Sequence, residues 1–257
     1  MTDLFFDIDI RVALSEPQYV STIRQEIQNG AVGVVRQFLD ASTVAQLREY
    51  LSSIGRSSIP TYEPIEIGKP NFHRLNYSDE RAHVKGCFHQ FVFYPWNQDV
   101  FNLFALLGDL FRLKNLISRN PQDRFLGRLG ENGMISRIAI QFYPSGKGFL
   151  NRHQDPTGDH QLTVPTIVLS DKSSDFIAGG AFIEDEFGYR TYLDDYTSLG
   201  DVVFFDSRTT HGVELIDPGS NSHWLDFKGR WSCLIATNKV ASNDQVNDAI
   251  DLGEQWT

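Results

Sequence analysis

With 257 residues, of which 41% are hydrophobic and 22% are charged, the chain has the composition of a globular protein with a sizeable core. This composition excludes a disordered or collagen-like protein. The formal net charge of −10, with no cluster of basic residues to offset it, disfavours nucleic acid as a partner because a phosphate backbone would be repelled.

The cysteines and the apolar runs predict where the protein is found. Cys87 and Cys233 are too few for a disulfide framework or a thiolate metal site, which is typical of a reducing compartment. The chain begins with acidic and apolar residues, unlike an export signal. The most apolar stretch, residues 101–113, is interrupted by charges and is shorter than the roughly 18 residues of a membrane span. We therefore expect a cytoplasmic protein without a membrane partner, and the oligomeric state is not predicted.

The first part of the chain is expected to be largely helical. Pro17 in a first turn and apolar residues at helical spacing predict a helix over residues 15–30. A short strand is expected at 32–38, followed by a helix that Asp40 caps and that stops at Gly55. A third helix is predicted over residues 99–117.

Residues 57–94 show no clear hydrophobic period and contain three prolines, three histidines and several aromatic residues. A long segment without regular structure is usually functional or disordered, so this one could cover a substrate pocket as a lid. The aromatic side chains from here to Trp96 could equally pack helices against a sheet. The candidates for the pocket wall are Asn71 to Arg74, Phe88, Phe91, Tyr94 and Trp96.

From residue 133 onward the chain changes to short β-rich runs separated by turn residues, typical of a β-sandwich or barrel. No linker separates the two halves, so we expect a single domain with a helical buttress over residues 1–132 and a β core over residues 133–240. The strands are predicted at residues 136–143, 161–169, 181–186, 189–193, 201–206 and 230–237.

Three residues form a candidate metal site. Side chains two positions apart in an extended segment point to the same side, so His153 and Asp155 can bind one ion together. His211 follows a later predicted strand and can supply a third ligand. Two imidazoles and one carboxylate suit non-haem Fe(II), because three coordination positions stay open. A lone His-x-Asp would more often be a loop histidine bonded to its neighbour; the combination with His211 favours the metal site.

A candidate anion receptor lies on the last predicted strand. Arg230 and Ser232 are also two positions apart and face the same way. A guanidinium binds a carboxylate through two hydrogen bonds, and a neighbouring hydroxyl can donate another. The pair is therefore suited to the far end of a dicarboxylate.

The order of these motifs resembles the Fe(II)/2-oxoglutarate-dependent oxygenases, and within them the phytanoyl-CoA dioxygenase-like branch. The match covers residues 133–238, and residues 33–40 resemble the opening of that branch more loosely. The resemblance implies a mainly β fold with flanking helices, built on a double-stranded β-helix (a jelly roll of cupin-like type) with iron in its open end.

By this resemblance, His153, Asp155 and His211 hold Fe(II), and Arg230 with Ser232 bind the distal carboxylate of the co-substrate 2-oxoglutarate, with O2 as the oxidant. The stretch between His211 and Arg230 is longer than usual in the family, which implies an insertion around residues 218–228.

The resemblance also narrows the chemistry. Halogenases of the family replace the ligand carboxylate by a small residue, whereas Asp155 is present here. The nucleic-acid demethylase branch carries a second arginine six residues after the first, where this chain has Ala236. A small organic substrate is therefore expected.

Two further residues are candidates for contacts with the co-substrate or the substrate. On the predicted strand 136–143, Gln141 and Tyr143 fall on the face opposite to Ile138, Ile140 and Phe142. Polar groups on the inner face of a jelly roll suit a polar ligand. An outward-facing, solvated row is the alternative.

The sequence thus predicts a dioxygenase that hydroxylates, desaturates or cyclises a small substrate, as in specialised-metabolite biosynthesis, with release of succinate and CO2. Two alternatives remain at this stage. One is a cupin-type metal enzyme, a dioxygenase or an isomerase, that does not use 2-oxoglutarate. The other is a binding module that kept the fold without catalysis.

Overall fold

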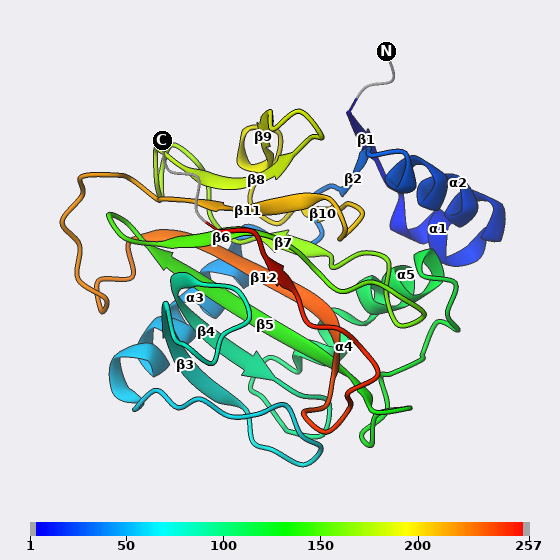
Figure 1. Cartoon of the computed structure of the whole chain (residues 1–257), viewed down its shortest axis with the longest axis horizontal. Coiled ribbons are helices and arrows are strands. Elements are labelled where there is room, and N and C mark those ends of the chain that lie inside the picture. The colour runs from blue at the N-terminus through cyan, green and yellow to red at the C-terminus, as the bar shows by residue number, and fades with distance from the viewer. Residues whose placement is uncertain (1–3, 254–257) are drawn as a thin grey trace.

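The computed structural model describes residues 4–253 (Figure 1). The first helices are α1 (Ile10–Ser15) and α2 (Pro17–Gln28). Asp9 caps α1 by accepting hydrogen bonds from two backbone N–H groups, and Pro17 begins α2, as predicted from the sequence. Within residues 4–253, no helix has the length and apolar character needed to cross a membrane.

The next elements attach the N-terminal part to the main sheet. Strand β1 (Phe5–Asp7) runs parallel to β2 (Val32–Val35), and β2 pairs with a strand of the later β core. Helix α3 (Ala41–Ser57) begins at the Asp40 cap but continues through Gly55, where we expected it to stop. Gly55 serves packing instead, because a Cβ there would lie 2.3 Å from the ring of Phe227.

The expectation of a structureless segment over residues 57–94 was wrong. It contains β3 (Phe72–Tyr77) and β4 (Gly86–Phe93), which pair antiparallel over their length. All eight residues of β4 are buried, so both of its faces are covered. A strand that is covered on both faces lacks the alternation by which half-buried strands are recognised in a sequence.

The predicted helix over residues 99–117 is two helices, α4 (Leu103–Leu106) and α5 (Gly108–Ile117), with the break at Leu107. The side chain of Asp99 accepts hydrogen bonds from the backbone N–H groups of Phe101 and Leu103, so regular helix starts only at Leu103. Helix α5 packs against the N-terminal helices α1 and α2.

The later strands follow the predicted ones closely, with four exceptions. The strand expected at 161–169 begins only after Pro165, and three strands, β6, β11 and β13, had not been predicted. The strands are β5 (Met134–Pro144), β6 (Phe149–Gln154), β7 (Thr166–Val168), β8 (Gly180–Glu184), β9 (Arg190–Tyr192), β10 (Val202–Phe204), β11 (Thr210–Glu214), β12 (Gly229–Lys239) and β13 (Ile250–Asp251), with a short 3-10 helix, η1 (Leu193–Asp195), after β9.

The strands form one strongly curled sheet of 13 strands, in the order β1-β2-β10-β7-β12-β5-β4-β6-β11-β8-β9, with β13 on β6 and β3 on β4. Figure 1 shows β8, β9 and β11 above the long strands β5 and β12, with α3 behind them. The fold is a mainly β jelly roll with flanking helices, which confirms the predicted fold class. The first 132 residues, expected to be helical, also contribute β1 to β4.

The two faces of the long strands differ in polarity. Ile138, Ile140 and Phe142 of β5 belong to a large apolar core that includes residues of α2, α3 and α5. Alternate residues of a strand point to opposite faces, so Arg137, Gln141 and Tyr143 face the interior of the curled sheet. The jelly roll therefore encloses a polar wall, and the helices cover the apolar one.

Gly200 joins the β core to the segment that precedes α3, and its substitution tests that junction. Its φ is +86°, and a Cβ would lie 1.9 Å from the carbonyl oxygen of Leu39. We expect Gly200→Ala to lower the free energy of unfolding by at least about 3 kcal/mol, measured by urea denaturation. Gly219→Ala is the matched control, because Gly219 has φ +85° but open space around it. The control measures the cost of the backbone strain alone, which is about 1 kcal/mol. If both variants lose the same free energy of unfolding, the proposed clash with the Leu39 carbonyl oxygen is contradicted.

Candidate metal centre

Two imidazoles meet because their strands are neighbours. His153 on β6 and His211 on β11 are directly opposite in an antiparallel pair, and their ring centroids are 4.1 Å apart. The register shifts immediately after His211, as at a β-bulge. Asp155 follows β6 by one residue and is anchored by its backbone N–H, which donates to the carbonyl of Ser207. The chain thus delivers the third group from the end of the same strand.

The backbone fixes which ring nitrogen each histidine presents to the centre. Nδ1 of His153 lies 2.9 Å from the carbonyl oxygen of Asn151, and Nδ1 of His211 lies 2.8 Å from that of Thr209. A carbonyl oxygen can only accept, so each Nδ1 carries the proton and donates. In a neutral ring held this way, Nε2 carries the lone pair with which a histidine binds a metal.

Both Nε2 atoms point toward Asp155. They lie 3.7 Å (His153) and 3.5 Å (His211) from the carboxylate oxygens, and one potential ligand atom from each of the three residues falls within 4.8 Å of the others. Burial, with His211 nearby, lowers the pKa of His153 to about 4, so this imidazole is neutral at physiological pH. Burial would raise the pKa of Asp155, but its contact with His211 and the positive groups around it hold that pKa below its usual value.

A further strand supports the centre from outside. In β13, Asp251 pairs with His153 of β6, and its carboxylate accepts hydrogen bonds from the side chain of Asn151 and the backbone N–H of Lys85. Asn151 is the residue whose carbonyl orients His153. Asp251 therefore holds in place the backbone that selects the tautomer of His153. The sequence had not singled out Asp251, since a single acidic residue in a polar stretch carries no pattern.

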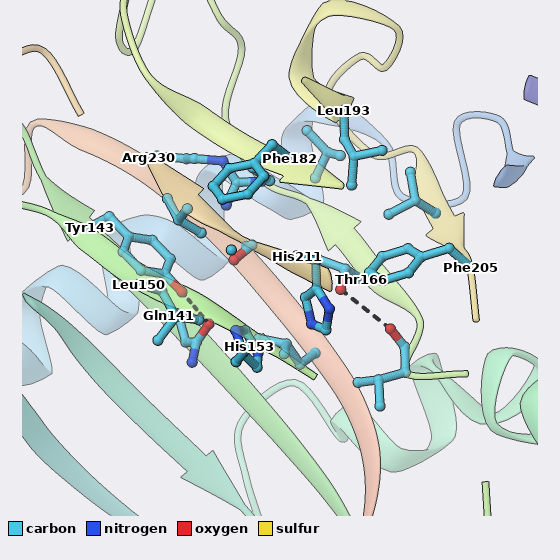
Figure 2. Close-up of a pocket in the computed structure, with 18 of the residues that line it drawn as sticks. Gln141, Tyr143, Leu150, His153, Thr166, Phe182, Leu193, Phe205, His211 and Arg230 are labelled. Atoms are coloured by element: carbon cyan, nitrogen blue, oxygen red, sulfur yellow. Dashed lines mark hydrogen bonds between the residues drawn. The ribbon is translucent and has the colours of Figure 1, made fainter. Parts of the chain in front are cut away.

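The cavity that contains the triad also contains the other predicted site residues. Gln141, Tyr143, Arg230 and Ser232 all line it, and Figure 2 shows Gln141 and Tyr143 on one wall beside His153. Most of the lining of the cavity is apolar. The Tyr143 hydroxyl donates to Oε1 of Gln141 at 2.6 Å, and burial raises the pKa of this tyrosine.

Arg230 has a partner that the sequence did not suggest. Its Nε and Nη2 donate to the two carboxylate oxygens of Asp194, at 2.8 and 3.0 Å, and both side chains are almost fully buried. Its Nη1, and the hydroxyl of Ser232 on the same face of β12, make no hydrogen bond within residues 4–253. Asp194 could not be told from its neighbour Asp195 in the sequence, although Asp195 pairs with Lys172 instead.

Three other histidines are buried and do not belong to the triad. His160 is buried. His73 and His89 are buried in an aromatic cluster and hydrogen-bonded to each other, with 2.9 Å between Nε2 of His73 and Nδ1 of His89. His89 Nε2 donates to the carbonyl of Trp224, so His89 Nδ1 must accept and His73 Nε2 must donate.

No protein-family model matches the sequence. No curated protein matches it either. The fold is similar to a Pseudomonas putida prolyl-4-hydroxylase, with a TM-score of 0.52 and 14% identity over 86% of this chain and 98% of that one. It is similar to a full-length Neurospora crassa protein in complex with alpha-KG, with a TM-score of 0.52 and 10% identity over 96% of this chain and 92% of that one.

A third similar structure is the epimerase SnoN in complex with Fe3+, alpha-ketoglutarate and nogalamycin RO, with a TM-score of 0.51 and 10% identity over 93% of this chain and 97% of that one. The chain shares their fold. These matches extend over nearly the whole length on both sides, so the likeness includes the helices as well as the jelly roll.

The triad predicts a selective effect on metal binding. We expect His211→Ala to weaken binding of Fe(II) or Co(II) by more than about 100-fold, since loss of even an outer partner of a ligand costs roughly 10- to 100-fold. The free energy of unfolding of the metal-free protein should change by less than about 1 kcal/mol. Calorimetry and the Co(II) absorption spectrum measure the binding, and His223→Ala, an exposed histidine, is the control. Unchanged Co(II) binding in His211→Ala would remove this residue from the site.

The His73–His89 pair predicts acid sensitivity. Burial lowers the pKa of His73 to about 4 and that of His89 to about 3, whereas both titrate near 6.5 when unfolded. The unfolded chain therefore binds more protons below pH 6.5, so stability is lost as the pH falls from 6.5 toward 4, by up to about 1.4 kcal/mol per pH unit for each group. His89→Gln should reduce this slope in urea titrations of metal-free protein, and His223→Gln should not. An unchanged slope in His89→Gln would show that this imidazole is not kept neutral by the fold.

Proposed function

We propose that the protein is an Fe(II)- and 2-oxoglutarate-dependent oxygenase that oxidises a small organic substrate. The observation that carries the proposal is the convergence of two imidazoles and one carboxylate inside a jelly-roll cavity that also contains a buried arginine. Two of the similar structures hold alpha-ketoglutarate, and one of these holds iron. The resemblance to the phytanoyl-CoA dioxygenase-like branch supports the same proposal.

The donor set fits Fe(II) better than calcium, magnesium or a structural zinc ion. Calcium and magnesium prefer oxygen ligands, and structural zinc sites use thiolates, whereas the groups here are His153, His211 and Asp155. The three ligands would occupy one side of the ion and leave the side that faces the cavity open for a co-substrate. The fixed Nδ1 hydrogen bonds keep both imidazoles ready to bind without reorganisation.

Arg230 and Ser232 are the residues that we propose for the distal carboxylate of 2-oxoglutarate. Asp194 binds the Nε–Nη2 edge of Arg230 and fixes the direction of the guanidinium, which leaves Nη1 for the co-substrate. The Ser232 hydroxyl can donate a second bond. Gln141, opposite Ser232 in the β5–β12 register, and Tyr143, opposite Arg230, would complete the polar wall beside the keto acid.

When bound, iron would activate O2, which is the oxidant, and 2-oxoglutarate would supply two electrons by oxidative decarboxylation to succinate and CO2. This chain holds the metal through the triad, orients the keto acid through Arg230, and limits water through the apolar lining of the cavity. Hydroxylation is the default outcome. The prolyl hydroxylase and the epimerase share the fold, so the outcome depends on which substrate atom the pocket presents to the metal. A substrate from specialised-metabolite biosynthesis is consistent with this proposal.

One observation favours a second candidate. Arg230 is already neutralised by Asp194, so a cupin-type metal enzyme that does not use 2-oxoglutarate would leave this ion pair intact as a structural feature. The two candidates differ in a single property, which is whether the iron protein binds 2-oxoglutarate.

Anaerobic titration separates the two candidates. Fe(II) with 2-oxoglutarate should give a visible charge-transfer band, and air should then yield succinate. Because removal of one partner from a buried ion pair leaves an unpaired charge, we would replace both as Arg230→Gln with Asp194→Asn. This double variant should keep Co(II) binding and need more than about 30-fold more 2-oxoglutarate for the band.

Ser232→Ala should need only about 3- to 10-fold more 2-oxoglutarate, because it loses one hydrogen bond. Arg56→Ala, on the exposed surface of α3, is the control. If the wild-type protein binds iron but gives no band, the cupin-type candidate replaces the oxygenase. If iron is not bound, both enzyme candidates are wrong.

A further inference from the structure

The polar face of the sheet that forms one wall of the cavity continues beyond the residues that line the cavity. The strand pairing places Arg74 (β3), Gln90 (β4), Gln141 (β5) and Ser232 (β12) in one continuous row across four neighbouring strands. Gln141 and Ser232 line the cavity of the triad, so the whole row faces that side of the sheet. Arg137 lies on the same face of β5, about 13 Å along the strand from Gln141.

Arg74 and Arg137, which we call the arginine pair, lack a carboxylate partner. No ion pair joins either guanidinium to an acidic residue within residues 4–253, and the side chain of Arg137 makes no hydrogen bond there. Each Nε is sealed from solvent without a hydrogen-bond partner. The side-chain oxygens of Gln90 and of Tyr94, which directly follows β4, are also buried without partners. Unpaired buried polar groups are rare in folded proteins, and four of them belong to β3, β4, β5 and the residue that follows β4.

The nearby carboxylates are all engaged elsewhere. Asp79, whose charge acts on Arg74, is bound by two hydrogen bonds from Arg81. Glu63, whose charge acts on Tyr94, lies 3.7 Å from Lys69. Asp155, whose charge acts on Arg137, belongs to the triad. None of these groups is available to neutralise the arginine pair.

Electrostatics make this arrangement costly without a ligand. Burial lowers the pKa of Arg137 to about 10 and also lowers that of Arg74, and the two charges repel each other. Both guanidiniums nevertheless stay charged at neutral pH. Two like charges in a partly desolvated site are stabilised by an anion that both can bind, and paired guanidinium N–H groups match the geometry of a carboxylate or a phosphate.

We propose that the arginine pair binds an oxyanion, a carboxylate or a phosphate group, of the substrate itself. The site adjoins the triad, since Arg137 and Asp155 interact through their charges, but it lies away from Arg230 along the wall. The aromatic ring of Tyr62, over which the Arg74 guanidinium stacks at 4.9 Å, covers the arginine from the segment that we expected to act as a lid. The Tyr94 hydroxyl can donate a further bond to the anion. That this oxyanion belongs to a substrate of oxidation rests on the proposed function.

A second arginine cluster provides the contrast. Arg24, Arg119 and Arg124 line a separate surface hollow, where Arg24 donates to the carbonyls of Leu116 and Ile117 and Arg124 pairs with Glu131. Arg119 is exposed. Because this hollow has no triad residue in its lining, Arg119→Gln is a matched control for binding of anions at a surface arginine.

The test is calorimetry on anaerobic protein loaded with Fe(II) and 2-oxoglutarate, at constant ionic strength. The probes are phenylacetate and phenyl phosphate, with phenylacetamide as the neutral isostere. We expect at least one of the anions to bind, and the amide to bind at least about tenfold more weakly. Arg137→Gln and Arg74→Gln should each raise the dissociation constant of the anion by at least about tenfold. Arg119→Gln should leave this constant unchanged.

Two readouts separate a ligand site from a structural role. The melting temperature of Arg137→Gln should equal or exceed that of the wild type, because an unpaired buried charge has been removed. The 2-oxoglutarate concentration that half-saturates the charge-transfer band should stay within about twofold of the wild-type value. A tenfold increase would mean that Arg137 binds the co-substrate instead and would overturn the proposal.

The remaining outcomes are also decisive. Equal binding of the amide and the anions, or loss of anion binding in Arg119→Gln alone, would overturn the proposal. Absence of the charge-transfer band in the wild-type protein would refute the proposed function only, because calorimetry with the metal-free protein still measures whether the arginine pair binds an oxyanion.

Discussion

The antiparallel pairing of β6 with β11 is the contact on which the candidate site depends. It places His153 opposite His211, and the backbone carbonyls of both strands then fix which nitrogen of each ring faces the centre. Neither strand is long, and β6 is supported on its other side by β13 through the pairing of Asp251 with His153. The geometry of the centre is thus set by main-chain hydrogen bonds, which are less tolerant of movement than side-chain contacts alone.

The arginines on the interior face of the jelly roll differ in whether they have a carboxylate partner. Arg230 and Asp194 satisfy each other in a buried ion pair, so this part of the wall is complete within the chain itself. Arg74 and Arg137 stand on the same wall without an acidic partner among the described residues, and their Nε atoms are unsatisfied. Unpaired buried charges lower the stability of a protein, and a ligand of opposite charge can offset this loss. Such destabilising groups are found mostly at functional sites. The same face of the sheet thus carries an arginine with a carboxylate partner, which lines the cavity, and two arginines without one, which lie beyond the lining of the cavity.

The fold class was predictable from the sequence because the later strands alternate and are separated by turn residues. The three groups of the candidate centre were predictable because His153 and Asp155 are close in sequence and follow a recognisable order with His211. The β3–β4 hairpin was missed, because burial on both faces of β4 removes the alternation. Asp194 was missed because its importance comes from Arg230, which is distant in the chain.

Arg137 was not singled out in the sequence for a different reason. The alternation of β5 already placed it on the polar face with Gln141 and Tyr143, but only the latter two were singled out as contacts for a ligand. Whether a guanidinium is paired is a property of the tertiary structure, since any of several acidic residues could have neutralised it. The structure shows that it is not: no ion pair joins Arg137 to a carboxylate within residues 4–253, and Asp155, whose charge acts on it, belongs to the triad.

The attachment of β13 to β6 has a consequence for how the protein is made. His153 emerges from the ribosome long before Asp251, so the strand that carries it lacks one neighbour until nearly a hundred further residues have been translated. During that interval Asn151 has no carboxylate to bind, and the backbone that orients the imidazole is less constrained. A chain that ends before residue 251 would therefore carry His153, Asp155 and His211 without this support for the backbone at Asn151.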